Sequence, residues 1–182
     1  MNLPNLLSFF RLFVTAFFIL LIAYERFGLA LFLFVLQALS DLLDGFFARR
    51  MGAKTNLGAY LDPLADKVML SSSYIVLCFQ RIVPIGLVSV VLIRDLVISL
   101  GFFVLLKRGL TISPVPSLIS KMTTVFQMLT VVYVLLFADR AFEPFFVYTK
   151  SFFFYTTALL TAVSGFQYVF AGWTVFFRKE IV

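Results

Sequence analysis

Hydrophobic residues occur along the chain in six long runs, which charged residues, Pro and Gly separate. A transmembrane helix needs about 20 mostly apolar residues, and most of the runs approach that length. The pattern therefore predicts an all-α integral membrane protein with six transmembrane helices. Their approximate bounds are residues 9–23, 29–47, 61–79, 85–106, 118–137 and 152–177.

The six runs form a single unit of organisation, because no internal repeat, low-complexity linker or soluble domain interrupts them. Residues 1–182 are therefore expected to form a single transmembrane domain. A signal peptide is the alternative for the first run. No basic residue follows Met1 directly and no small-residue cleavage pattern ends the run, so a membrane span is favoured.

Composition narrows the chemistry that this protein can perform. Of its 182 residues, 62% are hydrophobic and 13% charged, whereas soluble domains are about half apolar and a quarter charged. A water-soluble enzyme is thus excluded. The sequence contains no His, which removes imidazole base catalysis, His-ligated zinc and a His-containing triad. Catalysis must use carboxylates, hydroxyls, Lys and Arg.

Basic residues in the loops predict the orientation in the membrane, since cytoplasmic loops are richer in Lys and Arg. One side carries Arg49, Arg50, Lys54, Lys107, Arg108, Arg178 and Lys179. The other side carries Arg26, Arg81, Arg140 and Lys150. Both termini are therefore expected in the cytoplasm, in a bacterial inner (cytoplasmic) membrane. The net charge of +6 suits anionic lipid head groups, and no basic run is long enough to indicate nucleic-acid binding.

Four carboxylates lie at the facing ends of the second and third runs: Asp41, Asp44, Asp62 and Asp66. Each acid at mid-membrane costs about 2.5–3.5 kcal/mol on insertion scales. Four facing lipid would together cost on the order of 10 kcal/mol, comparable to the stability of a whole domain. They are therefore expected to face a hydrated cavity, a cation, or both.

Their spacing favours a metal site. Asp41 and Asp44 are three residues apart and Asp62 and Asp66 four apart, so each pair shares one face of a helix. The short hydrophilic segment 50–57 makes the two helices antiparallel neighbours, which brings four like charges together. Oxygen ligands without His or Cys suit Mg²⁺ or Mn²⁺. Two ions are reasonable for four carboxylates, because paired metals hold the attacking and leaving oxygens in phosphoryl transfer.

Each Asp also has a structural interpretation. Asp62 before Pro63 resembles a helix N-cap with proline at the first helical position. Asp41 and Asp44 have Arg49 and Lys67 as possible salt-bridge partners. For any single Asp the structural interpretation is favoured, but four at helical spacing on one hairpin favour the metal site.

Small residues beside the acids are suited to a nucleotide. Gly45 and Ala48 leave a strip without bulky side chains where a base or ribose can approach, and Gly58 keeps the opposite wall small. Arg49 can pair with a phosphate as well as with an Asp. Close helix packing is the alternative for Gly45 and Ala48, and on their own it is favoured.

Read together, these residues resemble the signature of the CDP-alcohol phosphatidyltransferase family, over essentially the whole chain. They form the pattern Asp41-x2-Asp44-Gly45-x2-Ala48-Arg49-x8-Gly58-x3-Asp62-x3-Asp66. The resemblance implies a six-span fold, a homodimer, and a site open to the cytoplasm and the lipid. It also implies direct transfer from a CDP-linked lipid to an alcohol, with release of CMP.

The resemblance also assigns roles to the residues. Asp41, Asp44 and Asp62 would bind two divalent cations, Mg²⁺ or Mn²⁺, and Asp66 would complete the site and act as the base on the acceptor hydroxyl. The nucleotide site would consist of Asp44, Gly45, Ala48, Arg49 and Gly58.

Two branches of the family remain open for the acceptor. Residues 5–8 with Arg11, and residues 61–67, resemble phosphatidylglycerophosphate synthases and CDP-dependent cardiolipin synthases. Both use CDP-diacylglycerol and a phosphate-bearing acceptor, glycerol 3-phosphate or phosphatidylglycerol. Residues 94–95 and 117–121 look closer to cardiolipin synthases, whereas Lys121, with the residues three and six positions after it, resembles the synthase acting on glycerol 3-phosphate. Phosphatidylglycerophosphate synthase is the first hypothesis and cardiolipin synthase the alternative.

Arg94 and Lys121 are the candidates for holding the acceptor's phosphate, since both lie on the expected cytoplasmic half and a buried cation needs a partner. The alternative for Arg94 is a neutral pair with Asp95 or with a motif Asp, and Lys121 is able to extend to the interface.

A non-enzymatic cation transporter is a remote alternative from another class. Such folds usually contain repeated halves and broken helices near the midplane, and the sequence shows neither. A membrane assembly factor without activity is a further alternative, and it would not need Gly45, Ala48 and Gly58 at fixed positions beside the acids.

Overall fold

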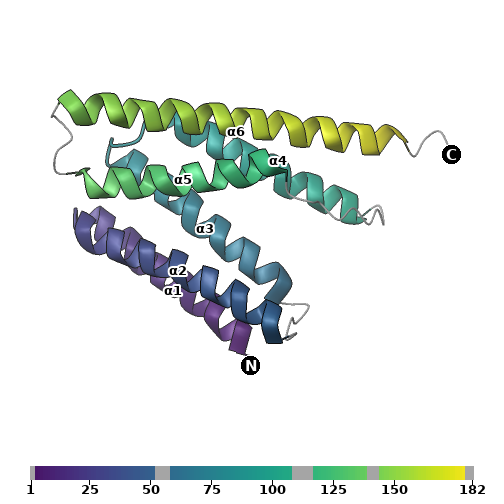
Figure 1. Ribbon diagram of the computed structural model, residues 1–182, viewed down its shortest axis with the longest axis horizontal. Coiled ribbons are helices and arrows are strands. Elements are labelled where there is room, and N and C mark those ends of the chain that lie inside the picture. The colour runs from purple at the N-terminus through teal and green to yellow at the C-terminus, as the bar shows by residue number, and fades with distance from the viewer. Residues whose placement is uncertain (1–2, 52–57, 108–116, 139–143, 179–182) are drawn as a thin grey trace. The chain divides into compact units, whose positions relative to one another are not determined.

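Six α-helices make up the computed structural model, which describes residues 3–51, 58–107, 117–138 and 144–178, and side chains over 12–40, 67–101, 117–138 and 145–172 (Figure 1). The helices are α1 Leu3–Ala23, α2 Phe27–Met51, α3 Gly58–Phe79, α4 Ile85–Lys107, α5 Leu118–Leu136 and α6 Pro144–Arg178. The prediction of an all-α chain with one helix for each apolar run is confirmed.

Helix bounds differ from the apolar runs mainly at α1 and α6. α1 begins at Leu3, six residues before the predicted span, and Pro4 lies in its first turn, where its missing N–H removes no helical bond. α6 begins at Pro144 and has 35 residues. Both helices extend beyond their apolar segments because backbone hydrogen bonding does not require hydrophobic side chains.

The chain divides into two compact units, each described here by itself. The first comprises residues 1–83 and 131–146. In it α1 packs against both α2 and α3, and α2 and α3 run in opposite directions (Figure 1). Phe18 of α1 and Phe34 of α2 are fully buried, with ring centroids 5.8 Å apart. Nearby, the Gln37 side-chain amide donates a hydrogen bond of 3.2 Å to the Thr15 hydroxyl.

A tight turn after α3 ties this helix to the end of α1. Arg81 has a φ of 58°, the left-handed conformation that lets the chain reverse, and its N–H donates to the carbonyl of Cys78. The Gln80 amide then donates to the carbonyls of Ile22 and Ala23, at 3.1 and 3.3 Å. These carbonyls belong to the last turn of α1, where no N–H of the same helix remains to bond them; the Ile22 carbonyl also accepts from the backbone N–H of Glu25 at 2.9 Å. Gln80 therefore fastens the carboxyl ends of α1 and α3 together.

The second unit comprises residues 84–130 and 147–182, and it contains a polar seam between α5 and α6. Thr123 donates to the carbonyl of Leu160 at 3.0 Å, and Thr130 and Thr157 share a hydrogen bond of 2.7 Å. These threonines belong to a set of fully or almost fully buried residues: Thr123, Gln127, Thr130, Thr157, Thr161 and Ser164. These residues recur every three or four positions on each helix, so one stripe of α5 faces one stripe of α6.

Membrane spans are confirmed only in part. Within the described residues, Leu118–Leu136, with a mean hydropathy of 1.5, is the one helix long and apolar enough to cross a membrane. Shorter apolar segments are Leu12–Ala23, Phe27–Ser40 and Lys67–Phe79. Six crossings therefore stay a prediction.

Candidate functional site

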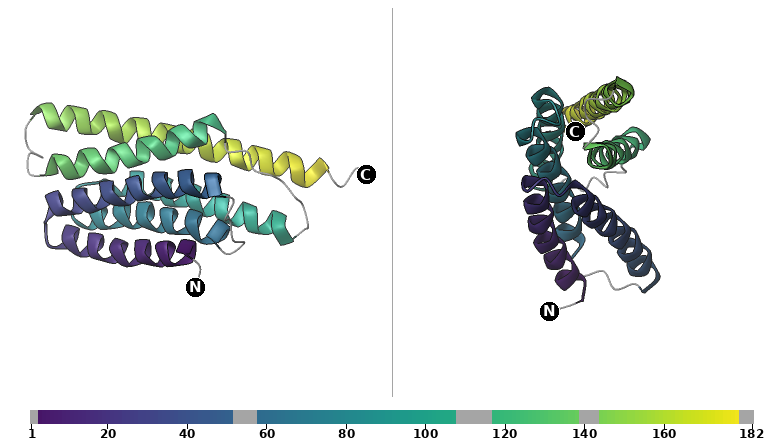
Figure 2. Two further views of the ribbon diagram at one scale, coloured as in Figure 1. Left: turned by 60° about the horizontal axis from the view of Figure 1, so that its bottom comes forward. Right: turned by 90° about the vertical axis from the view of Figure 1, so that its left-hand side faces the viewer.

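The predicted metal ligands lie on two helices of the first unit that run in opposite directions. Asp41 and Asp44 belong to α2, and Asp62 and Asp66 belong to α3. The end of α2 and the start of α3 lie at the same end of the unit, in both views of the chain (Figures 1 and 2).

Helical rise gives the depth of each position. At 1.5 Å per residue, Asp44 and Asp41 lie about 10 and 15 Å before the end of α2 at Met51, and Asp62 and Asp66 about 6 and 12 Å after the start of α3. All four positions therefore lie within about 15 Å of these helix ends. Their side chains lie outside the described ones, so the metal site stays a prediction.

The same helices carry the predicted nucleotide-binding residues. Gly45, Ala48 and Arg49 lie in the last two turns of α2, and Gly58 is the first residue of α3. Because α3 begins four residues before Asp62, the interpretation of Asp62 as an N-cap is wrong. The other roles at these positions depend on side chains outside the described set.

Arg94 forms a second, separate cluster, in the second unit. It lies in α4 and is only 7% exposed. Its Nη1 donates to the Asp95 carboxylate at 2.8 Å, so the pairing with Asp95, which was the alternative interpretation of Arg94, is confirmed. Its Nη2 donates to two hydroxyls, Ser120 Oγ of α5 at 2.7 Å and Ser164 Oγ of α6 at 3.1 Å. Three helices thus hold one guanidinium group.

Local structure explains how Ser120 reaches this position. Ser117 directly precedes α5, and its Oγ accepts a hydrogen bond of 3.1 Å from the backbone N–H of Ser120. This is the geometry of an N-cap. The Ser117 hydroxyl also donates to Gln167 Oε1 of α6 at 3.2 Å. The start of α5 is therefore fixed against α6 within one turn of the Arg94 contact.

Besides Ser164, two other residues of α6 lie close to Arg94. A Cβ at Gly165 would lie 3.6 Å from Arg94 Cγ, an ordinary contact distance, and the Tyr168 ring centroid is 5.9 Å from the Arg94 guanidinium carbon. A cation this close to an aromatic ring is attracted by its negative face. Arg94 Nε, however, is buried and has no hydrogen-bond partner among the described residues.

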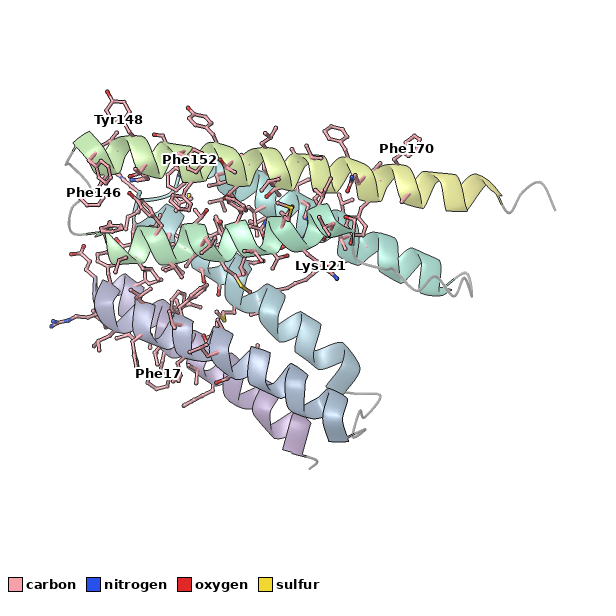
Figure 3. The ribbon with its side chains drawn as sticks, viewed as in Figure 1. Phe17, Lys121, Phe146, Tyr148, Phe152 and Phe170 are labelled. Carbon is pink, nitrogen blue, oxygen red and sulfur yellow. The ribbon has the colours of Figure 1, made fainter. Side chains whose placement is uncertain are left out.

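Lys121 follows Ser120 in α5 but does not join this cluster. It is exposed, and Figure 3 shows its side chain extending away from α5. Adjacent helical positions do not face each other, so Ser120 points to Arg94 whereas Lys121 does not. The two predicted acceptor-binding residues thus differ: one is buried and fixed by partners, and the other is free to reach outward.

Sequence reasoning missed the proximity of Ser164, Gly165 and Tyr168 to Arg94. The spacing of Thr157, Thr161 and Ser164 was the available signal, because hydroxyls at intervals of four and three residues form a polar stripe on an otherwise apolar helix. That stripe meets α5 and ends at Arg94.

Comparison with known proteins adds an independent result. Residues 1–173 match the CDP-alcohol phosphatidyltransferase family. The CDP-diacylglycerol–glycerol-3-phosphate 3-phosphatidyltransferase of Aquifex aeolicus is 39% identical over 133 residues, 71% of this chain and 73% of the relative. The enzyme of the same name from Wigglesworthia glossinidia brevipalpis is 31% identical over 98% of this chain and 99% of its own length.

Cardiolipin synthases are also similar. The CMP-forming cardiolipin synthase of Rattus norvegicus is 34% identical over 94% of this chain and 61% of the relative. The family match covers nearly all of the sequence, and the motif lies on α2 and α3 within it. The chain therefore belongs to the CDP-alcohol phosphatidyltransferase family.

Proposed function

We propose that this protein is a membrane enzyme of phospholipid biosynthesis that transfers a phosphatidyl group from CDP-diacylglycerol to glycerol 3-phosphate and releases CMP. The observation that carries the proposal is the similarity over nearly full length to an enzyme named for this reaction, together with the eight motif residues on α2 and α3.

A cardiolipin synthase, which uses CDP-diacylglycerol and phosphatidylglycerol, is the second candidate. The rat and human enzymes of that name are 34% and 32% identical over 94% of this chain. Glycerol 3-phosphate is preferred because the Aquifex aeolicus relative, which is 39% identical and matched over 73% of its length, is named as a glycerol-3-phosphate 3-phosphatidyltransferase. Family membership also favours an enzyme over the cation transporter.

Two divalent cations, Mg²⁺ or Mn²⁺, complete the proposal, held by Asp41, Asp44, Asp62 and Asp66. The fit rests on the donor set: four carboxylates on two helices that run in opposite directions, within about 15 Å of the end of α2 or the start of α3, supply only oxygen ligands, which hard cations prefer. When bound, such ions neutralise the diphosphate and stabilise the leaving CMP.

The chain's own residues then bind the nucleotide and move one proton. Asp44, Gly45, Ala48, Arg49 and Gly58 form the nucleotide site, where the small residues leave room for cytidine and Arg49 pairs with phosphate.

Asp66 acts as the base in the transfer step. It accepts the proton of the acceptor hydroxyl while the acceptor oxygen bonds to the phosphorus of the phosphatidyl group. The bond from that phosphorus to the CMP oxygen breaks in the same displacement, so CMP leaves with its oxygen.

Arg94 and Lys121 are proposed to hold the phosphate of the acceptor. Arg94 supports this role because it is a buried guanidinium whose Nε–H has no partner among the described residues. Asp95 offsets its charge but occupies only Nη1. Lys121 supplies an exposed and extensible cation on α5. Arg94→Ala and Lys121→Ala should each raise the KM for the phosphorylated acceptor, and an unchanged KM would contradict this role.

We place the enzyme in a bacterial inner membrane, with six crossings, its site facing the cytoplasm, and as a homodimer. The helices contain 19 to 35 residues, or about 28 to 52 Å at 1.5 Å per residue, against a hydrocarbon core of about 30 Å. Large apolar side chains point outward, among them Phe17, Tyr148 and Phe170 (Figure 3). Such an apolar surface suits a lipid environment.

One assay tests the proposed function. The purified protein, with CDP-diacylglycerol and Mg²⁺ or Mn²⁺, is given glycerol 3-phosphate, phosphatidylglycerol or another alcohol, and CMP release is measured. We expect CMP with glycerol 3-phosphate. CMP with phosphatidylglycerol alone would make the protein a cardiolipin synthase, and no CMP with any alcohol would refute the enzyme.

A further inference from the structure

Ser120 and Ser164 bind the same nitrogen of Arg94 from two different helices. Nη2 carries two N–H groups, and it has two hydroxyl partners, at 2.7 Å on α5 and 3.1 Å on α6. Nη1 is paired with Asp95 on α4 itself. Of the three nitrogens, only Nε has no partner in the described part of the chain.

The rigidity of the guanidinium group gives this arrangement a consequence. The group is planar and presents its N–H donors in a fixed fork, so partners that hold Nη1 and Nη2 also set the direction of the Nε–H bond. A buried donor without a partner is unfavourable in an isolated protein. An oxygen of a bound anion would satisfy it.

We propose that Ser120 and Ser164 are positioning residues for the acceptor: they orient Arg94 so that its Nε–H donates to the acceptor's phosphate. This inference rests on the proposed function. The serines do not touch the acceptor and act only through Arg94. They therefore affect how tightly the phosphate is held, and neither the cation-binding aspartates nor the transfer step depends on them.

The polar seam supports a specific role for Ser164 rather than general adhesion between helices. Thr157 and Thr161, on the same stripe of α6, bond to residues of α5, whereas Ser164 bonds to Arg94 of α4. Ser164 is also fully buried, so water does not replace its hydroxyl in the contact. This difference provides a matched control within one helix.

Kinetics of the purified full-length enzyme test the proposal. Ser164→Ala and Ser120→Ala should each raise the KM for glycerol 3-phosphate about tenfold, the effect expected when one hydrogen bond to a charged group is lost. The kcat and the KM for CDP-diacylglycerol should stay within about twofold, as expected for a residue that acts on binding alone. Ser120→Thr, which keeps the hydroxyl at a position that is 8% exposed, should restore the acceptor KM.

Thr157→Val is the control. It removes an equally buried interhelical hydroxyl two turns from Ser164 but touches neither Arg94 nor its partners. We expect it to lower thermal stability about as much as Ser164→Ala does and to leave the acceptor KM unchanged.

The outcomes separate the two proposals. If the unaltered enzyme releases no CMP with glycerol 3-phosphate, the proposed function fails. If it is active and both serine variants have an unchanged acceptor KM, or the same change as Thr157→Val, the positioning role is refuted. If Ser164→Ala does not fold, Ser120→Ala and Ser120→Thr decide the matter alone.

Discussion

Replacing Arg94 with Met should destabilise the protein strongly, and the structure allows the size of the effect to be worked out. The substitution removes a cation that is 8% exposed and leaves behind Asp95, whose side chain is 13% exposed. Removing one partner of a buried ion pair costs about 3–5 kcal/mol, because the other charge stays buried without compensation. The hydroxyls of Ser120 and Ser164 add little, since serine can donate to a carbonyl one turn earlier in its own helix.

A double-mutant cycle isolates the contribution of the ion pair. Asp95→Asn keeps an oxygen that accepts from Nη1 but loses the charge, so it should cost about 1.5–3 kcal/mol. The double variant Arg94→Met/Asp95→Asn contains no buried carboxylate at position 95 without a cationic partner. The double variant should therefore be more stable than the sum of the single variants indicates, by at least about 1 kcal/mol.

Thermal unfolding of the purified protein in detergent measures all four members of the cycle. For a chain of this length, 3–5 kcal/mol corresponds to a fall in Tm of roughly 6–20 °C. A Tm for Arg94→Met within about 2 °C of the unaltered protein would show that Arg94 and Asp95 are both well hydrated. Strict additivity in the cycle would show that the contact of 2.8 Å does not couple them.

Three further expectations concern the site. Asp66→Asn should abolish CMP release but keep nucleotide binding, because the amide cannot accept the hydroxyl proton; full turnover in this variant would exclude Asp66 as the base. Removing divalent cations with a chelator should stop CMP release, and added Mg²⁺ or Mn²⁺ should restore it; activity that survives chelation would contradict the cation site. Gly165→Ala should be tolerated, since its Cβ would lie 3.6 Å from Arg94 Cγ, whereas Gly165→Leu should raise the acceptor KM by displacing Arg94. Equal kinetics for the two Gly165 variants would show that α6 does not constrain Arg94.

Hydrophobic patterning predicted the six helices well, because each apolar run is long enough to favour a helix over any other structure. It predicted their ends less well. α6 begins at Pro144, ahead of the polar residues Thr149, Lys150 and Ser151, which a hydropathy count assigns to a loop. Polar side chains do not stop a helix when their backbone groups continue the same hydrogen-bond ladder.

The candidate site was predictable to the extent that it depends on local sequence. The positions of Asp41 and Asp44 on one helix follow from spacing alone, and so does the pairing of Arg94 with its neighbour Asp95. The contact of Arg94 with Ser164, 70 residues away, was not predictable. A single sequence shows which residues share a stripe of one helix but not which helix that stripe meets.

Gln80 joins the carboxyl ends of α1 and α3 through its hydrogen bonds to the carbonyls of Ile22 and Ala23. α1 and α3 are joined at their carboxyl ends, so any movement that parts them must pivot there and be largest at the opposite end. That opposite end is the one at which α2 stops and α3 starts, with Asp62 about 6 Å from the tip. Asp62 thus lies on the part of α3 that such a movement would displace most, whereas the carboxyl end of α3 is held by Gln80.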